Sequence, residues 1–472
     1  MIRLIEGLAA RRGYAELAFD VCVAFVQGEL DPKDYLLVEY EKEYACTNSN
    51  GEKCYALLLR PLYGVASAPR AFSAARDKWL METFNANGWT VRVSIFAPCL
   101  YIFKAPSGNP YFMTSHVDDN YVCGPEMAEA KVIRDAANRR FVVKDVDHRQ
   151  LLGVQRKKHA DGSLEYLMTG FIRHLHERFK EHCSDKQRDV PFPFNEMLER
   201  GTDADEGAAV EALGLRSLVG GLMWAYRMAM PLLGPGLNQV CKVVSSPTPR
   251  AWDCAIHLLE WAYQERDRGI RLAAPNALDE LHCFYDAGGV RDPQDSKCQY
   301  GWVVMVWGGP VDWATKKQKH VSHAGTMGLE FMSKSHAVKA TAHMRMLMID
   351  IGILERDAPP NMVIGDNKNA VIYATELKLT PNMKHLRECY FLSREWHQSG
   401  EMTYWWVNGT DNPADPMSKP VSKEVIAAQA DRVLGYTDER YKLPAHAHQG
   451  KGLGVKYPVD REAMARHAAE LG

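Results

Sequence analysis

The segment 111–124 has the sequence Tyr-Phe-Met-Thr-Ser-His-Val-Asp-Asp-Asn-Tyr-Val-Cys-Gly, which predicts two strands joined by a tight turn. Asp118 and Asp119 fall at this turn, so their carboxylates point into the same space. Like charges at such short range repel each other and need a compensating partner. That partner is either solvent, at an ordinary exposed turn, or a divalent cation held by oxygen ligands.

A third carboxylate lies upstream, inside an apolar segment. Residues 15–25 (Ala-Glu-Leu-Ala-Phe-Asp-Val-Cys-Val-Ala-Phe) predict a buried strand, and Asp20 interrupts it. A buried charge needs a partner, so Asp20 is a candidate to lie beside the turn at 118 and 119. Three carboxylates in that arrangement suit two magnesium ions, which align and neutralise an in-line phosphoryl displacement. Phe25 then either lies under the sugar of a nucleotide and excludes a 2′-hydroxyl, or is an ordinary core aromatic.

Four further acids in the last third of the chain stand at strand ends or in helices. They are Asp286 after a strand over 281–285, Glu330 within a helix over about 327–353, Asp366 after a strand over 362–365, and Asp415 at the start of a short helix. Strand ends followed by helices bring such acids to one edge of a mixed sheet. There they suit two magnesium ions that activate water and cleave a phosphodiester. Taken singly, Asp366 and Asp415 are also explained as helix caps and Asp286 as a turn residue.

The composition bounds the class of protein. At 472 residues the chain is long enough for two to four domains, and 46% hydrophobic with 25% charged residues is typical of soluble globular proteins. No apolar run reaches bilayer-spanning length, and residues 1–13 are too charged for a signal peptide, so we expect no membrane association and an intracellular location. Eleven cysteines without a Cys-x-x-Cys pair predict thiols rather than a zinc or disulfide framework.

Any binding to nucleic acid has to come from local basic patches, because the formal net charge is only −2. One such patch lies on a helix predicted over 67–87, which opens with Ser-Ala-Pro and stops at Asn-Gly. Arg70, Arg76 and Lys78 on this helix either touch a template backbone or lie on a solvated face.

Four short motifs follow one another in the first third of the chain. They are Asp20-Val21-…-Ala24-Phe25-…-Gly28-Glu29-Leu30, Leu62-Tyr63-Gly64-…-Ala68-Pro69-Arg70-Ala71-Phe72, Val117-Asp118-Asp119 and Leu151-Leu152-Gly153. Each motif alone is weak, but the ordered set resembles the reverse transcriptase of copia-type (Ty1/copia) LTR retrotransposons. The resemblance implies a polymerase site built from Asp20, Asp118 and Asp119.

A second set of motifs surrounds the four acids of the last third. They are Trp313-…-Lys316-Lys317-Gln318-Lys319, Asp366-Asn367-…-Ala370, Lys384-His385 and Ala414-Asp415-…-Ser418-Lys419-Pro420. This set resembles the ribonuclease H of the same elements, whose catalytic acids follow the order Asp, Glu, Asp, Asp. The resemblance implies cleavage of the RNA strand of an RNA–DNA hybrid by Asp286, Glu330, Asp366 and Asp415. Lys316, Lys317 and Lys319 are candidate phosphate contacts, with a solvated lysine run as the alternative.

The resemblance covers nearly the whole chain and implies a mixed α+β fold with five parts. They are a polymerase palm over 1–125 with the fingers largely missing, a thumb-like part over 126–190, a linker and helical connection over 191–275, a ribonuclease H-like mixed-sheet domain over 278–424, and a C-terminal helix and tail over 425–472. The expected partners are an RNA template, a DNA primer, the RNA–DNA hybrid and deoxynucleoside triphosphates, with two Mg²⁺ per active site and Mn²⁺ as an alternative ion. We expect the protein in a cytoplasmic virus-like particle, in the nucleus, or in both.

Several positions depart from the family pattern. His116 and Ser67 stand where the family has Tyr and Gln, Gly288 replaces an acid, and another acid near Glu330 is displaced at 327–328. Two interpretations therefore stay open. The chain is either an RNA-directed DNA polymerase with ribonuclease H activity, or a truncated or decayed copia-type fragment that binds nucleic acid or protein without catalysis.

Overall fold

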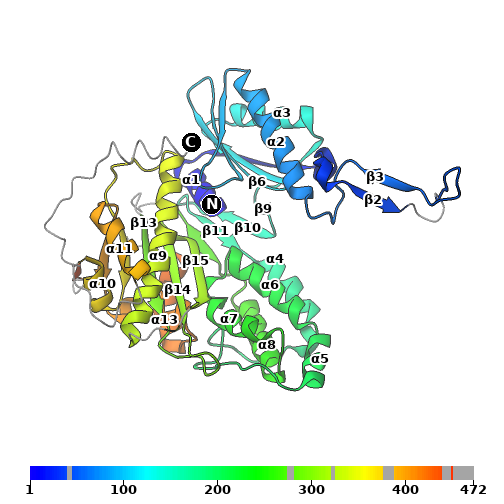
Figure 1. The fold of residues 1–472 in the computed structure, drawn as a ribbon. Coiled ribbons are helices and arrows are strands. Elements are labelled where there is room, and N and C mark those ends of the chain that lie inside the picture. The colour runs from blue at the N-terminus through cyan, green and yellow to red at the C-terminus, as the bar shows by residue number, and fades with distance from the viewer. Residues whose placement is uncertain are drawn as a thin grey trace. The chain divides into compact units, whose positions relative to one another are not determined.

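The computed structural model describes residues 1–39, 45–273, 281–319, 321, 325–375, 387–437 and 448–449. The chain folds into two compact units, Met1–Leu152 and Gly153–Gly472. Both units combine helices with sheets, so the predicted mixed α+β class is confirmed (Figure 1). The segment Lys384-His385, which carried part of the resemblance, lies outside the described residues.

The first unit is built on an antiparallel sheet with the strand order β4-β5-β6-β7-β1-β8. Its strands are β1 (Ala15–Val21), β4 (Thr90–Val93), β5 (Leu100–Lys104), β6 (Pro110–His116), β7 (Asp119–Gly124) and β8 (Val143–Val146). Its helices are α1 (Ile2–Arg12), α2 (Ala68–Asn85) and α3 (Met127–Arg140). The short elements are η1 (Ala24–Gln27), η2 (Pro32–Asp34), β2 (Leu36–Glu39), β3 (Tyr55–Leu58) and β9 (Gln150–Leu151). The β2–β3 hairpin projects away from the sheet (Figure 1).

Helices cover both faces of this sheet at the central hairpin. Val122 of β7 packs in the core that holds Ile133 of α3. On the opposite face, Tyr121 of β7 is buried and feels the charge of Glu6 on α1. This double cover explains why β6 and β7 are buried along nearly their whole length. The structure also groups α3 and β8 with this sheet, although the sequence suggested a boundary near residue 125.

The second unit begins with a small antiparallel sheet and a helical segment. The strands are β10 (Val154–Lys158), β11 (Leu164–Leu167) and β12 (Ile270–Leu272). The helices are α4 (Thr169–Arg178), η4 (Lys180–His182), α5 (Ala204–Ala212), α6 (Leu215–Met228), η5 (Pro231–Leu233), α7 (Gly234–Val243) and α8 (Pro249–Gln264). In the described residues no single helix has the length and hydropathy of a membrane span; α5 and α6 reach them only together, across a bend of 59°.

The rest of the second unit is a mixed sheet with the strand order β15-β14-β13-β16-β17-β18. Its strands are β13 (Leu281–Ala287), β14 (Gln299–Val306), β15 (Gly309–Lys317), β16 (Asn361–Gly365), β17 (Met402–Trp406) and β18 (His448–Gln449). The helices are α9 (Gly325–Asp350), α10 (Lys368–Thr375), α11 (Arg387–Gln398), η7 (Gly409–Asp411), α12 (Asp415–Ser418) and α13 (Lys423–Leu434). Strands β13, β16 and β17 run parallel, whereas β14 and β15 are antiparallel.

Adjacent residues of β14 show that α9 and α12 lie on opposite faces of this sheet. The ring of Tyr300 stacks on His336 of α9, with ring centroids 4.8 Å apart. The next residue, Gly301, faces Met417 of α12. The sheet is thus enclosed between a long helix and a short one, and each carries one of the predicted acids.

Candidate active sites

The first carboxylate group forms at the hairpin between β6 and β7. Asp20 of β1 is the direct antiparallel partner of Asp119, the first residue of β7. Opposite residues in antiparallel strands project their side chains to the same face, with Cβ atoms about 5 Å apart. The predicted proximity of Asp20 to the turn is therefore present in the structure.

The turn itself has an unusual backbone. Val117 adopts a left-handed conformation with φ 59°, which is costly for a β-branched residue. Asp118 follows it, and its carbonyl accepts hydrogen bonds from the Val21 backbone amide at 3.0 Å and the Asn120 side chain at 2.6 Å. The turn is thus held against β1 although its local conformation is strained, a combination found at functional sites.

Asp20 and Asp118 repel each other, but the three acids of this group do not converge closely. Burial and the charge of Asp118 raise the pKa of Asp20, while Lys144 on the neighbouring strand β8 opposes that shift. In the described part of the chain, Asp20, Asp118 and Asp119 do not bring one carboxylate oxygen each within 4.8 Å of the others. The geometry gathers the acids but does not by itself form a closed ion pocket.

Arg76 supports this hairpin from below, which we did not predict from the sequence. The predicted helix is present as α2, but Arg76 is buried rather than facing solvent or a template. Its guanidinium donates to Tyr101 Oη at 2.8 Å and to Ser115 Oγ at 2.6 Å, and it lies 3.4 Å from the Val117 carbonyl. A signal was present in the sequence, because Arg76 lies four residues from both Phe72 and Leu80 on the apolar face of the helix, but its partners appear only in the tertiary structure.

Phe25 and Arg70 occupy different surroundings. The predicted strand ends at Val21, so Phe25 lies in the 3-10 helix η1, where its ring packs edge-to-face on Tyr63 at 4.7 Å. The buried-strand prediction was wrong for residues 22–25, because the chain turns at Val23, which has a positive φ. Arg70 is exposed near the start of α2. The nucleotide-contact roles of Phe25 and Arg70 stay predictions.

The second carboxylate group converges tightly. Asp286 lies near the end of β13, Glu330 on α9, and Asp366 directly after the parallel strand β16. One carboxylate oxygen from each lies within 4.8 Å of the others. Because β13 and β16 are parallel neighbours, their carboxyl ends meet at the same sheet edge, and α9 crosses that edge.

Burial and the charges of neighbouring acids disfavour the charged forms of Glu330 and Asp366. Burial, followed by the charges of Asp286 and Asp366, raises the pKa of Glu330 well above its usual range. Burial and the charge of Asp286 raise the pKa of Asp366 to about 7. Perturbed carboxyls at a strand edge are typical of catalytic and metal sites.

Asp415, the first residue of α12, is linked to this group by Ser418 at the end of that helix and by Lys419 directly after it. Lys419 forms an ion pair with Asp415 and lies 3.3 Å from Asp286 Oδ2. The Ser418 hydroxyl donates a hydrogen bond to Asp286 Oδ2. Burial and the Asp286 charge raise the pKa of Asp415, and the Lys419 charge opposes that shift. The sequence placed Asp415 and Lys419 in one motif, but it assigned a role only to the acid.

The three carboxylates at this sheet edge of the second unit fit a divalent cation. Asp286, Glu330 and Asp366 offer hard oxygen ligands, which Mg²⁺ and Mn²⁺ prefer. Glu330 Oε2 is buried without a hydrogen-bond partner, although buried polar atoms are nearly always paired. An unpaired oxygen facing two other carboxylates is what a bound cation would satisfy.

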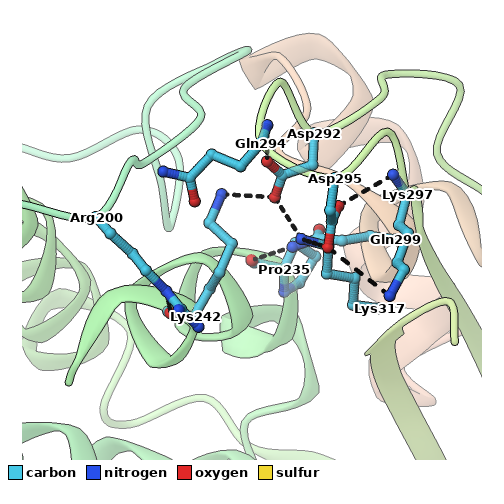
Figure 2. A network of polar contacts seen from close by, with 9 residues as sticks. All are labelled: Arg200, Pro235, Lys242, Asp292, Gln294, Asp295, Lys297, Gln299 and Lys317. Carbon is cyan, nitrogen blue, oxygen red and sulfur yellow. Dashed lines mark hydrogen bonds and ion pairs between the residues drawn. The ribbon is translucent and has the colours of Figure 1, made fainter. Parts of the chain in front are cut away.

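The lysines predicted to contact phosphate differ in their surroundings. Lys317 points into the interior, where its ammonium binds Asp292 at 2.5 Å and Asp295 at 2.9 Å (Figure 2). Lys242 of α7 binds the same Asp292 carboxylate at 2.9 Å. This network joins β15 to the helical segment, so the Lys317 charge is already neutralised. Lys316 and Lys319 are exposed, and their contact with phosphate stays a prediction.

The comparisons with known proteins point to one class, the Pol polyproteins of transposons. The chain is homologous to the Pol polyproteins of copia-type transposons. It is 26% identical over 431 residues to "Retrovirus-related Pol polyprotein from transposon RE2" of Arabidopsis thaliana, which covers 89% of this chain and 28% of that protein. It is 22% identical over 427 residues to the corresponding polyprotein from transposon TNT 1-94 of Nicotiana tabacum, which covers 89% of this chain and 31% of that protein. The chain thus spans less than a third of these relatives.

The remaining comparisons add little. No family model matches the chain. One solved structure that matches is the N-terminal ribonuclease H domain of rv2228c from Mycobacterium tuberculosis, solved as a fusion with maltose binding protein. The match has 15% sequence identity and covers 33% of this chain and 98% of that domain's chain. Its TM-score is 0.23, a value too low to support a conclusion about this fold.

Proposed function

We propose that this chain is the reverse transcriptase and ribonuclease H part of a copia-type Pol polyprotein. In this role it synthesises DNA on RNA and DNA templates and cleaves the RNA strand of RNA–DNA hybrids. The observation that carries the proposal is the convergence of Asp286, Glu330 and Asp366 within 4.8 Å, from three elements far apart in the sequence. Homology to transposon Pol polyproteins over about nine-tenths of the chain supports it.

In the nuclease site, Asp286, Glu330 and Asp366 would hold a divalent cation, with Asp415 close by. The bound ion would supply activation of water and neutralisation of charge on the phosphoryl oxygens. The protein's own contribution is to hold the carboxylates in place: Ser333 donates to the Asp286 carbonyl at 2.9 Å, and Trp406 to the Asp366 carbonyl at 2.7 Å. A small hollow adjoins Lys419, and its lining includes Lys297 and Gln299.

In the polymerase site, Asp20, Asp118 and Asp119 would hold the Mg²⁺ ions that accompany a deoxynucleoside triphosphate. The direct pairing of Asp20 with Asp119 supports this assignment. Closure of this group around an ion would require the three carboxylates to approach one another. The bound nucleotide and primer end would supply that change through their own metal ligands.

Cleavage of an RNA–DNA hybrid in the presence of Mg²⁺ tests the nuclease assignment. Asp366→Asn should lower the cleavage rate by at least about a hundredfold, because it removes a metal ligand and a needed charge. Asp357→Asn, an exposed acid of the same unit, is the matched control and should cleave like the unmodified chain. Equal cleavage by all three proteins, or none by any, removes the nuclease function.

Primer extension on an RNA template tests the polymerase assignment separately. The unmodified chain should extend the primer, Asp118→Asn should not, and Asp135→Asn on the surface of α3 should behave as the unmodified chain. Hybrid binding without extension or cleavage by the unmodified chain would instead favour a non-catalytic nucleic-acid-binding module.

A further inference from the structure

A lysine occupies the position beside the nuclease carboxylates where a second cation is expected. The Lys419 ammonium lies 3.3 Å from Asp286 Oδ2 and forms an ion pair with Asp415. In two-metal sites, a carboxylate shared between the ions bridges two cations about 4 Å apart. Here Asp286 has Glu330 and Asp366 as neighbours, and its Oδ2 atom faces an ammonium that also binds Asp415.

The local structure holds Lys419 in this position. Asp415 is the first residue of the short helix α12, and Lys419 directly follows its last residue, so the single turn between them lets the two side chains meet. The Ser418 hydroxyl donates to Asp286 Oδ2 and lies 3.0 Å from the Asp415 carbonyl, so the helix end is tied to β13. The Lys419 side chain is 34% exposed, and its ammonium is held by the carboxylates of Asp286 and Asp415 rather than left in solvent.

The acid cluster is consequently divided into two corners. One corner, formed with Glu330 and Asp366, contains three carboxylates and the unpaired Glu330 oxygen. The other, formed with Asp415, already contains a positive charge. A divalent ion in this second corner would lie within a few ångströms of the ammonium, and like charges at that distance repel strongly.

We propose that the Lys419 ammonium serves as a resident cation of the nuclease site, so that one divalent ion binds at Asp286, Glu330 and Asp366 and Lys419 takes the place of a second. This proposal rests on the proposed nuclease function and deepens it. Asp415 is then a positioning residue for the lysine rather than a metal ligand. Lysine suits this role because its charge is a compact point on a flexible stem.

Counting bound Mn²⁺ ions by titration calorimetry and electron paramagnetic resonance tests the proposal without any substrate. Lys419→Met should bind one more Mn²⁺ per chain than the unmodified protein, because removal of the ammonium opens the second corner. Lys419→Arg keeps a charge and should bind the same number as the unmodified protein. Lys423→Met is the matched control, because Lys423 is a nearby exposed lysine that pairs with Asp189 instead. An unchanged count in Lys419→Met overturns the proposal.

A second variant decides the question even if Lys419→Met fails to fold. Asp415→Asn should leave the Mn²⁺ count unchanged, whereas it would lower the count by one if Asp415 were the ligand of a second ion. The double variant Asp415→Asn with Lys419→Met should not bind the additional Mn²⁺ that Lys419→Met alone binds. Failure of the proposed nuclease function has a different signature. The Mn²⁺ counts would then be as expected, but neither the unmodified chain nor any variant would cleave the hybrid.

Discussion

Asp292 and Asp366 are acids of the same unit, and their surroundings shift their pKa values in opposite directions. Burial alone would raise the pKa of Asp292, but hydrogen bonds from Lys317 and Lys242 outweigh it and lower the pKa to about 2. For Asp366, burial and the Asp286 charge act together and raise the pKa to about 7. At the scale of single residues, the protein neutralises one buried acid with its own lysines and leaves the other to be neutralised by a proton or a cation.

Asp292→Asn should destabilise the second unit by about 3 kcal/mol, because Lys242 and Lys317 would lose the carboxylate between them. The folded pKa of Asp292 lies below its unfolded value, so its stabilisation is present above about pH 4 and is lost as the pH falls towards 2. Urea unfolding at pH 7 and pH 3 measures both effects. The difference between the two proteins should shrink at pH 3. Asp267→Asn, which removes an exposed ion pair, is the control and should change stability little.

After divalent ions are removed, the free energy of unfolding should decrease as the pH rises, and Asp366 should cause this decrease. Its folded pKa of about 7 lies above the unfolded value, so the native state holds an extra proton between about pH 4 and 7. In EDTA, the protonated Asp366 carboxyl contributes fully to the free energy of unfolding below pH 4, and this contribution is lost as the pH rises to 7. Thermal unfolding across this range should show a steeper decline for the unmodified protein than for Asp366→Asn. Added Mg²⁺ should restore the unmodified protein near neutral pH, and a pH profile identical in both proteins would contradict this account.

At the scale of elements, the nuclease site depends on how closely α12 approaches the sheet. Gly301 of β14 is the direct partner of Asp286, and a side chain there would collide with the Met417 carbonyl of α12. Thr315 of β15 also donates a hydrogen bond to this carbonyl, at 2.6 Å. The absence of a side chain at Gly301 therefore sets the position of the helix that carries Asp415.

Gly301→Ala should lower stability by about 1–3 kcal/mol, because the methyl group meets backbone rather than a side chain that can turn away. It should also lower hybrid cleavage at temperatures where the protein remains folded, since α12 has to move from the sheet. Gly289→Ala is the matched control, because a methyl group there meets nothing within 4 Å. Circular dichroism melting and cleavage rates measure the two effects, and normal cleavage by folded Gly301→Ala would show that the position of α12 is not critical.

At the scale of the whole molecule, each compact unit contains one carboxylate group. Asp20, Asp118 and Asp119 lie in Met1–Leu152, and all four acids of the proposed nuclease lie in Gly153–Gly472. Each unit also has its own sheet and buried core. The two proposed activities therefore draw on separate cores and separate acids.

The fragment Gly153–Gly472 expressed alone should fold and cleave an RNA–DNA hybrid, because it contains the complete second carboxylate group. Primer extension should be absent from this fragment. Circular dichroism reports its folding, and a cleavage assay with Asp366→Asn in the same fragment serves as the control. A folded fragment that cannot cleave would show that the first unit contributes to the nuclease.

The sequence by itself determined the mixed class of the fold, the strands and helices that carry the proposed acids, and the seven acids themselves. These features are local. Alternation, helical spacing, turn residues and ordered motifs depend on neighbours in the chain. The hairpin at Asp118 and the strand before Asp366 were both predictable for this reason.

Only the tertiary structure decided which charges meet. Lys419 reaches Asp286 across more than a hundred residues, Lys317 turns inward to Asp292, and Arg76 is buried beneath the hairpin. Two lysines of one motif, Lys316 and Lys317, consequently have different surroundings. The physical reason is that the energy of a charge depends on its burial and on partners brought near by folding, and neither appears in the spacing of residues along the chain.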